Sequence, residues 1–320
     1  MTPTIETATA PHLFEAGASA RRMMQHVLMG LAPVIVASVW FFRFQALLQI
    51  AVCLAVCAAT EAAICRLRGR AVSLGDRSVA ITALLLACSL PPRLPLYASI
   101  VGAVVAVALG KMAFGGLGHN IFNPAMVGRA FLMVCFPAAM TQWASPYEVD
   151  ALSGATPLAA FKFSGQPADL ASLCSGAVGG SLGETSAAAI LLGGAWVLWC
   201  RAGDWRLTAG MFTAAVAIAL ADDLLRPTAS YGVLAHLTSG GFMLGAFFIV
   251  TDPVTSPLSK RGRWLFGLTV GSLTMIIRLF AGYPEGVMFS ILLANALTPL
   301  FNRWALPIPV GGKTRHEAIA

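Results

Sequence analysis

The first long apolar stretch of the chain decides its fold class. It covers residues 24–65 and reads MQHVLMGLAPVIVASVWFFRFQALLQIAVCLAVCAATEAAIC. Arg43 divides the stretch into two apolar runs, Met24–Phe42 and Phe44–Cys65. Each run has the length of about 20 residues that a helix needs to cross a hydrocarbon core roughly 30 Å thick. The stretch therefore predicts two transmembrane helices that follow each other closely.

The rest of the chain repeats this pattern. Further candidate spans are Ser78–Leu90, Pro95–Ala113, Ile121–Pro137, Ala187–Cys200, Leu207–Leu224, Val233–Val250, Trp264–Leu279 and Glu285–Phe301. Of the 320 residues, 58% are hydrophobic and only 11% are charged, whereas roughly 25% are charged in a soluble domain. A soluble fold cannot bury so much apolar surface. The sequence predicts an all-α membrane protein with about ten transmembrane helices.

Composition also excludes several classes of function. The net charge of +7 does not indicate nucleic acid, because the basic residues lie between apolar runs and form no stripe among aromatic residues. The seven cysteines form no CxxC pair. The sequence therefore predicts no disulfide framework and no iron–sulfur or zinc site.

The distribution of Lys and Arg predicts the orientation. Most of the 21 basic residues fall in loops on one side of the predicted bundle, which is the cytoplasmic side by the positive-inside rule. Both termini of this multi-pass protein are then cytoplasmic. The predicted parts are a tail (1–20), a five-helix repeat (21–137), an external loop (138–186), a second five-helix repeat (187–301) and a second tail (302–320).

Two pairs of prolines predict that the halves are related. Pro253 follows Pro92 by 161 residues, and Pro284 follows Pro124 by 160 residues. Five spans in each half would place the two copies in opposite orientations, as in transport folds with inverted repeats. In such folds, Pro-interrupted segments at matching positions indicate a site near the midplane. The alternative is that each Pro simply ends a helix at the membrane interface.

The loop after the fifth run holds a motif of small residues. Residues 150–158 read DALSGATPL, so Ser153 and Thr156 flank Gly154 and Ala155. A hydroxyl group that accepts a transferred group must lie in an exposed loop, and small neighbours leave room for an enzyme to approach. Since Ala, Gly, Ser and Thr are abundant, an ordinary surface turn is the alternative interpretation of these four residues alone.

Together with three other segments, this motif resembles the RnfD/NqrB family of membrane flavoprotein subunits. The segments are 114–130 (FGGLGHNIFNPAMVGRA), 245–257 (GAFFIVTDPVTSP) and 278–299, which contains GYPEG and LLAN. The resemblance extends from Arg21 to Phe301 and is closer to the RnfD branch. The external loop is short for the family.

The resemblance implies a cofactor and a set of partners. In the family, the last Thr of a (Ser/Thr)-Gly-Ala-Thr motif forms a phosphoester with FMN, made by a flavin transferase that uses FAD. The matching residue is Thr156, and Asp150, Ser153, Gly154 and Ala155 surround it. The family also implies a second flavin, riboflavin. It further implies an Rnf complex with subunits A, B, C, E and G, which couples electron transfer between ferredoxin and NAD to Na⁺ or H⁺ translocation. The resemblance implies a bacterial inner membrane, and the flavin loop would then be periplasmic.

Polar residues of the glycine-rich segment are the other candidate ligands. Asn120, Asn123 and Arg129 all lie in it, and we expect them to contact a cofactor. Burying a charge in lipid is costly, so Arg129 has a function or a partner by default. It holds a flavin phosphate or ring edge, or it pairs with a carboxylate or with carbonyl groups of a broken helix.

Three further charged residues have simpler interpretations. Asp252 either caps a helix near the cytoplasmic face or helps to bind a cation. Glu61 and Lys111 lie near the cytoplasmic ends of their spans. We expect both to extend toward the lipid headgroups.

Three functions are consistent with these observations. The first is an FMN-carrying redox subunit, in which the cofactor supplies the chemistry and the protein supplies its position. The second is a solute or ion channel or transporter with inverted repeats, because fold alone does not determine function. The third is an inert scaffold for other subunits. The Thr156 motif distinguishes them, since a channel needs no flavin anchor.

Overall fold

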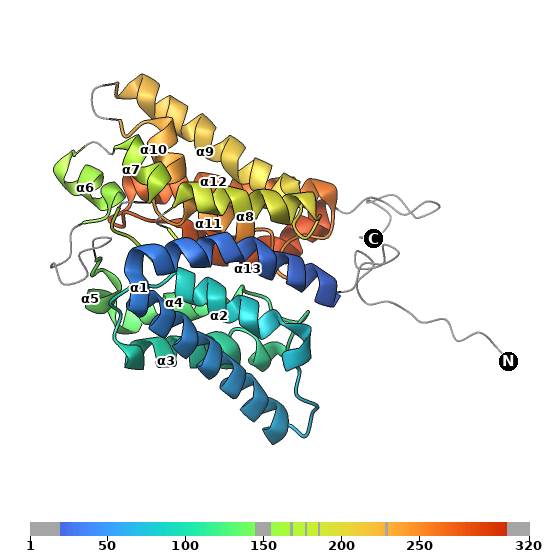
Figure 1. Cartoon of the computed structure of the whole chain (residues 1–320). Helices are drawn as coiled ribbons and strands as arrows, with labels where there is room; N and C mark the ends of the chain where they lie inside the picture. The colour runs from blue at the N-terminus through green and yellow to red at the C-terminus, as the bar shows by residue number, and fades with distance from the viewer. Residues whose placement is uncertain are drawn as a thin grey trace, which may run out of the picture.

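The chain folds as a bundle of α-helices (Figure 1). The computed structural model describes residues 20–144, 155–166, 169–176, 178–184, 186–227 and 230–305, and no β-strand occurs among them. Four helical segments are long and apolar enough to cross a membrane: Ala20–Leu67, Leu96–Phe114, Trp205–Leu225 and Lys260–Phe280. Shorter apolar helices lie beside them. The prediction of an all-α membrane protein is confirmed.

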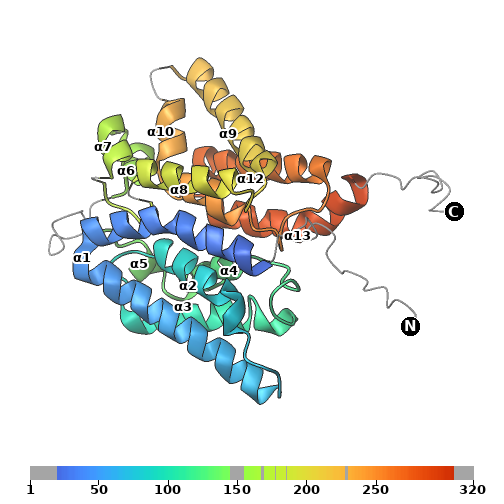
Figure 2. The same cartoon turned by 45° about the vertical axis from the view of Figure 1, so that its right-hand side comes forward.

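The first half begins with α1 (Ala20–Leu67), which is two helices joined at one residue. Arg43 has φ 50° and ψ −125°, and this non-helical backbone reverses the chain. The second helix returns toward the end of the bundle where the first began, as Figures 1 and 2 show. The two spans predicted around Arg43 are therefore present without a connecting loop.

The other helices of the first half are short, and each begins or ends at or near a proline. They are α2 (Ser78–Cys88), α3 (Leu96–Ala108), α4 (Pro124–Cys135) and α5 (Pro137–Met140), with 3₁₀ turns at Leu74–Asp76 and Met112–Phe114. The span predicted from Ile121 begins later, at Pro124, because the Asn123 side chain accepts hydrogen bonds from the N–H groups of Ala125 (3.1 Å) and Met126 (3.3 Å). This is an N-cap followed by Pro at the first helical position, which starts a helix efficiently.

The second half contains the long helices α9 (Trp205–Leu225), α12 (Lys260–Phe280) and α13 (Val287–Ala305), preceded by α6 (Pro157–Ser164), α7 (Leu170–Ser175) and α8 (Ala187–Trp199). The prediction of one continuous span over Val233–Val250 is wrong. That segment is divided into α10 (Val233–Thr238), α11 (Phe242–Leu244) and a π-helix, η4 (Gly245–Ile249). The break falls at Ser239–Gly241, where Gly240 has φ 62°.

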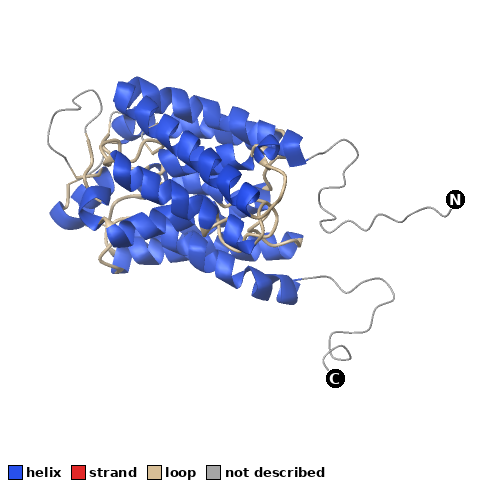
Figure 3. Cartoon of the chain, turned by 90° about the horizontal axis from the view of Figure 1, so that it is seen from below, coloured by secondary structure: helices blue, strands red, loops and turns tan. Residues whose placement is uncertain are grey.

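Both halves pair their helices in the same order. In the first half α1 packs against α3, and α3 packs against α4; in the second half α9 packs against α12, and α12 packs against α13. The halves meet where α1 packs against α8 and where α4 contacts α13. Seen from below in Figure 3, the described part of the bundle consists of helices joined by loops and turns. The inverted repeat, with its boundaries, stays a prediction that this packing order supports.

Candidate functional site

Thr156 begins the helix α6 at one end of the bundle. It has extended backbone angles (φ −61°, ψ 153°), its side-chain oxygen accepts a hydrogen bond from the Ala159 N–H (3.2 Å), and Pro157 follows it at the first helical position. Thr156 is half-buried and Ala155 is exposed. Asp150, Ser153 and Gly154 lie outside the described residues. The structure thus places the predicted anchor at a helix N-terminus, where phosphate groups are favoured.

A lysine connects α6 to the second half of the chain. The Lys162 ammonium donates hydrogen bonds to the carbonyl oxygens of Arg278 (2.6 Å), Tyr283 (2.9 Å), Ile277 (3.4 Å) and Ala281. These carbonyl groups end α12 and begin the turn after it. A cation at a helix C-terminus satisfies carbonyl groups that have no partner within the helix. Lys162 therefore fixes α6 against the end of α12.

A cavity of about 390 Å³ lies beside α6. Its lining includes Leu158, Phe161, Lys162, Arg226, His236 and Arg278. His236 is 3% exposed, and neither of its ring nitrogens has a hydrogen-bond partner among the described residues. Buried polar atoms normally have a partner. Both ring nitrogens are buried in the cavity wall, and their hydrogen-bonding capacity is unused among the described residues.

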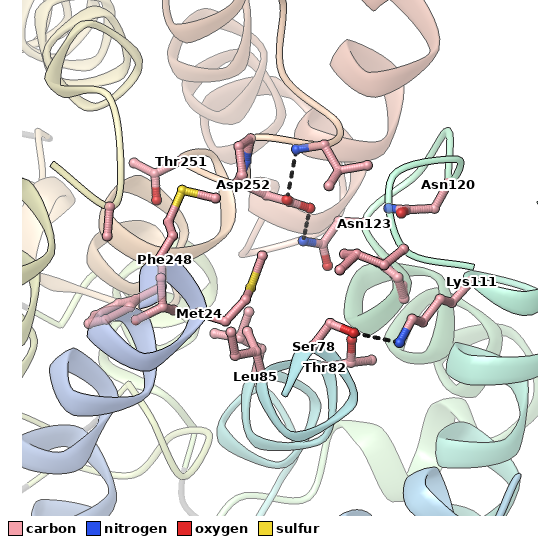
Figure 4. A pocket seen from close by; sticks show the side chains of 18 residues that line it. Met24, Ser78, Thr82, Leu85, Lys111, Asn120, Asn123, Phe248, Thr251 and Asp252 are labelled. Carbon is pink, nitrogen blue, oxygen red and sulfur yellow. Dashed lines mark hydrogen bonds between the residues drawn. The ribbon is translucent and has the colours of Figure 1, made fainter. Parts of the chain in front are cut away.

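A second pocket lies at the opposite end of the bundle, where the two halves meet (Figure 4). Asn123 from the start of α4 and Asp252 from the turn after η4 point toward each other there, and the Asn123 amide donates to the Asp252 carboxylate (3.4 Å). The Asn123 N–H donates to the side chain of Asn295 on α13 (3.0 Å). Asp252 also accepts from the Val254 N–H (3.1 Å) and the Thr255 hydroxyl (3.2 Å), so it orders its own turn and caps no helix start.

Asn120 lines the same pocket, but its amide is used locally. Its nitrogen donates to the Phe122 carbonyl oxygen (3.2 Å). The enclosed space of the pocket is about 60 Å³, which is enough for a few water molecules. A three-ring isoalloxazine does not fit there unless the ends of the two halves move apart.

Glu61 and Lys111 do not extend toward headgroups, so that prediction is wrong. Their side chains are 0% and 3% exposed, and the ammonium lies 2.6 Å from the carboxylate. Lys111 also donates to the Ser78 hydroxyl (2.6 Å), and Ser73 donates to Glu61 (2.5 Å). The pair forms because α1 and the end of α3 bring two residues 50 positions apart together. Hydropathy alone does not reveal which helix faces meet.

Arg129 is held by two carboxylates. Its guanidinium donates to Glu184 (3.3 Å), which precedes α8, and to Glu285 (2.9 Å), which precedes α13. The Glu285 carboxylate accepts a further hydrogen bond (2.5 Å) from the Gly241 N–H, at the break before α11. This confirms the carboxylate-pair interpretation of Arg129. Its role as a cofactor ligand stays a prediction.

Arg278 completes this polar region, and sequence reasoning missed it. Its guanidinium donates to the Ser239 carbonyl oxygen (2.9 Å) and to that of His236 (2.5 Å), both in the broken helix. Glu184 and Glu285 were missed as well. The usable signal was Arg129 itself, since a buried cation requires a partner and the chain has only 14 acidic residues.

A family model and individual relatives identify the same family for this chain. The model of the NQR2, RnfD, RnfE family matches residues 6–311. A relative from Stutzerimonas stutzeri, named as the D subunit of an ion-translocating oxidoreductase complex, is 38% identical, over 94% of this chain and 95% of the relative. The D subunit of a proton-translocating ferredoxin:NAD(+) oxidoreductase complex from Clostridium ljungdahlii is 37% identical, over 95% of each chain. Its counterpart in the Na(+)-translocating ferredoxin:NAD(+) oxidoreductase complex of Acetobacterium woodii is 38% identical, over 94% of this chain and 93% of the relative.

Proposed function

Because the chain belongs to the NQR2, RnfD, RnfE family and is one subunit of an ion-translocating oxidoreductase complex, we propose that it is the subunit that carries FMN on Thr156. The complex would couple electron transfer between ferredoxin and NAD to Na⁺ or H⁺ translocation, as the names of two relatives state for their own complexes. The partners would be Rnf subunits A, B, C, E and G and a flavin transferase. The flavin loop would face the periplasm.

The single observation that carries the proposal is the position of Thr156 at the N-cap of α6. The hydroxyl would take the FMN phosphate from FAD: a bond forms between the threonine oxygen and phosphorus, AMP leaves, and the hydroxyl proton passes to the transferase or to water. A phosphate on this oxygen would lie at the positive end of α6, where helix N-termini favour anions.

The chain's own residues would then position the flavin. FMN, when bound, supplies one- and two-electron transfer. Lys162 holds α6 in place through carbonyl groups at the end of α12. The cavity beside α6, which is lined by Phe161, Lys162 and Arg278, would receive the planar ring system. A second flavin, riboflavin, stays a prediction of the family resemblance.

Peptide mass spectrometry of the purified complex, co-expressed with a flavin transferase, tests the proposal. In the wild type we expect an FMN phosphoester on the peptide that holds Thr156. Thr156→Ala abolishes the adduct but also removes the helix cap. Thr156→Asn is the matched variant, because Asn caps a helix as well as Thr does and cannot form the ester.

The outcomes separate the three functions. Loss of the adduct and of electron transfer in Thr156→Asn, with normal assembly, supports the redox subunit. An unmodified Thr156 in an active complex contradicts the proposal and favours a channel. Normal electron transfer by an assembled Thr156→Asn complex favours the scaffold.

A further inference from the structure

A cavity of about 520 Å³ lies at the end of the bundle opposite α6. It is formed by the turn between α8 and α9, the turn after η4, and the start of α12. Four basic side chains line it: Arg201, Arg206, Lys260 and Arg263. Asp204 is its single acidic lining residue among the described part of the chain. The cavity therefore carries an excess of positive charge.

Asp204 compensates only two of the four cations. Its carboxylate pairs with Arg206 (3.2 Å) and with Arg263. Burial alone would raise the pKa of Asp204, but hydrogen bonds from the Arg206 N–H and the Arg263 guanidinium outweigh it, so the pKa lies below its ordinary value. Asp204 is thus an ionised and fully engaged partner.

The other two cations, Arg201 and Lys260, are available to a ligand. Both are exposed, and neither forms an ion pair with a carboxylate in the described ranges. Arg201 has φ 53°, a left-handed conformation that is uncommon for a residue with a side chain. The turn between α8 and α9 holds this arginine in the lining of the cavity. The positive ends of α9 and α12 add to the same field.

Aromatic residues place the cavity at the depth of the lipid headgroups. Trp205 lines it and is 53% exposed, and its ring meets Trp264 edge-on at 5.8 Å. The Arg206 guanidinium lies 5.0 Å from the Trp205 ring centre. Trp199, at the end of α8, is 87% exposed. Tryptophan concentrates at the boundary between membrane and water.

Apolar surface adjoins the charged cavity. Leu198 lines the cavity itself. Leu191 and Leu192 on α8 and Leu265 on α12 are exposed and lead from this end of the bundle toward its middle. A ligand that matches both features has an anionic head and a long apolar tail. A free phosphate or a soluble nucleotide uses only the charged part.

We propose that this cavity binds the phosphodiester headgroup of an anionic phospholipid, with the phosphate at Arg201 and Lys260 and an acyl chain along α8. Basic pockets between helices on the cytoplasmic side of membrane proteins suit such headgroups. The proposal does not depend on the flavin.

The test is native mass spectrometry of the full-length chain within its complex, titrated with dioleoyl-phosphatidylglycerol or dioleoyl-phosphatidylcholine. The variant is Arg201→Asn with Lys260→Gln, because Asn tolerates the left-handed backbone at position 201. The control is Arg66→Gln with Arg70→Gln, which removes two exposed cations near the end of α1. Inorganic phosphate is titrated separately into the wild type.

We expect the variant to bind phosphatidylglycerol about 25-fold more weakly, from roughly fivefold for each of the two basic side chains near an anionic surface. We expect the control to bind phosphatidylglycerol as tightly as the wild type does. The binding of phosphatidylcholine should be the same in the wild type and in both double variants. Equal losses in variant and control would overturn the proposal in favour of diffuse attraction. Inorganic phosphate that binds as tightly as the lipid would overturn it in favour of a soluble anion. If the double variant does not fold, Lys260→Gln alone replaces it, because this side chain is exposed. We expect the single variant to lose less affinity for phosphatidylglycerol than the double variant.

Discussion

Arg129 is the residue on which the junction between the two halves depends. It belongs to α4, whereas its partners Glu184 and Glu285 precede α8 and α13. All three side chains are at most 20% exposed. A buried ion pair adds little net stability over an apolar replacement of the whole set, but loss of one member leaves uncompensated charge.

We therefore predict that Arg129→Leu lowers the free energy of unfolding by roughly 3–5 kcal/mol. Thermal unfolding of the detergent-solubilised protein, followed by tryptophan fluorescence, measures this. Arg66→Gln is the control, because this arginine is exposed and forms no ion pair with a carboxylate in the described ranges. Its loss should stay below about 1 kcal/mol. Equal losses for the two arginines would contradict the assignment.

Single residues were also where the sequence was least informative. The anchor motif predicts Thr156 because a hydroxyl beside small residues is a local pattern. The Glu61–Lys111 pair and the partners of Arg129 depend on which helix faces meet across long sequence separations. No local pattern carries that information, and only the buried charge indicates that a partner exists.

Close contact between helices depends on glycine where α1 crosses α8. A Cβ atom at Gly193 would lie 1.9 Å from the Gly30 carbonyl oxygen and 3.0 Å from the Phe248 ring. Small residues allow helix backbones to approach in membranes, where dispersion contacts replace the hydrophobic effect. The α1–α8 crossing therefore tolerates no side chain at this position.

Gly193→Ala should separate α1 from α8 and destabilise the protein by about 1–3 kcal/mol, the usual cost of overpacking. Gly75→Ala is the control, because no atom lies within 4 Å of a Cβ built there. The same unfolding measurement applies to both. If Gly193→Ala is as stable as Gly75→Ala, the helices do not meet as closely as described.

Helices were predicted well where the end of an apolar run and the position of a proline indicate the same boundary. Ser78–Leu90 is the shortest of the candidate spans, and α2 ends at Cys88, shortly before Pro91 and Pro92. The break between α10 and α11 was missed because the run is mostly apolar, and Ser239, Gly240 and Gly241 interrupt it only briefly. The carbonyl groups freed there are satisfied by Arg278 from another helix, and hydropathy does not register such distant compensation.

For the molecule as a whole, α1 begins and α13 ends at the same end of the bundle, as Figures 1 and 2 show. Two native cysteines lie toward opposite ends. Cys174 is exposed on α7, and Cys200 is half-buried after α8. If the Lys and Arg distribution sets the orientation, Cys174 faces the periplasm and Cys200 the cytoplasm.

Single-cysteine variants labelled with a membrane-impermeant maleimide test this orientation. We expect Cys174 to react in right-side-out vesicles and Cys200 only in inverted vesicles. Labelling of both after detergent treatment controls for reactivity. The reverse pattern would place Thr156 on the cytoplasmic side and remove the periplasmic position of the flavin.

The reversal at Arg43 has a consequence for biogenesis. One residue separates two apolar helices, so no polar loop exists that could remain behind while the first helix enters the bilayer alone. The translocation machinery would have to accept both helices together as a hairpin, carrying a single guanidinium to the far side. Because the turn has no loop, a protease site or epitope inserted there would separate the two helices.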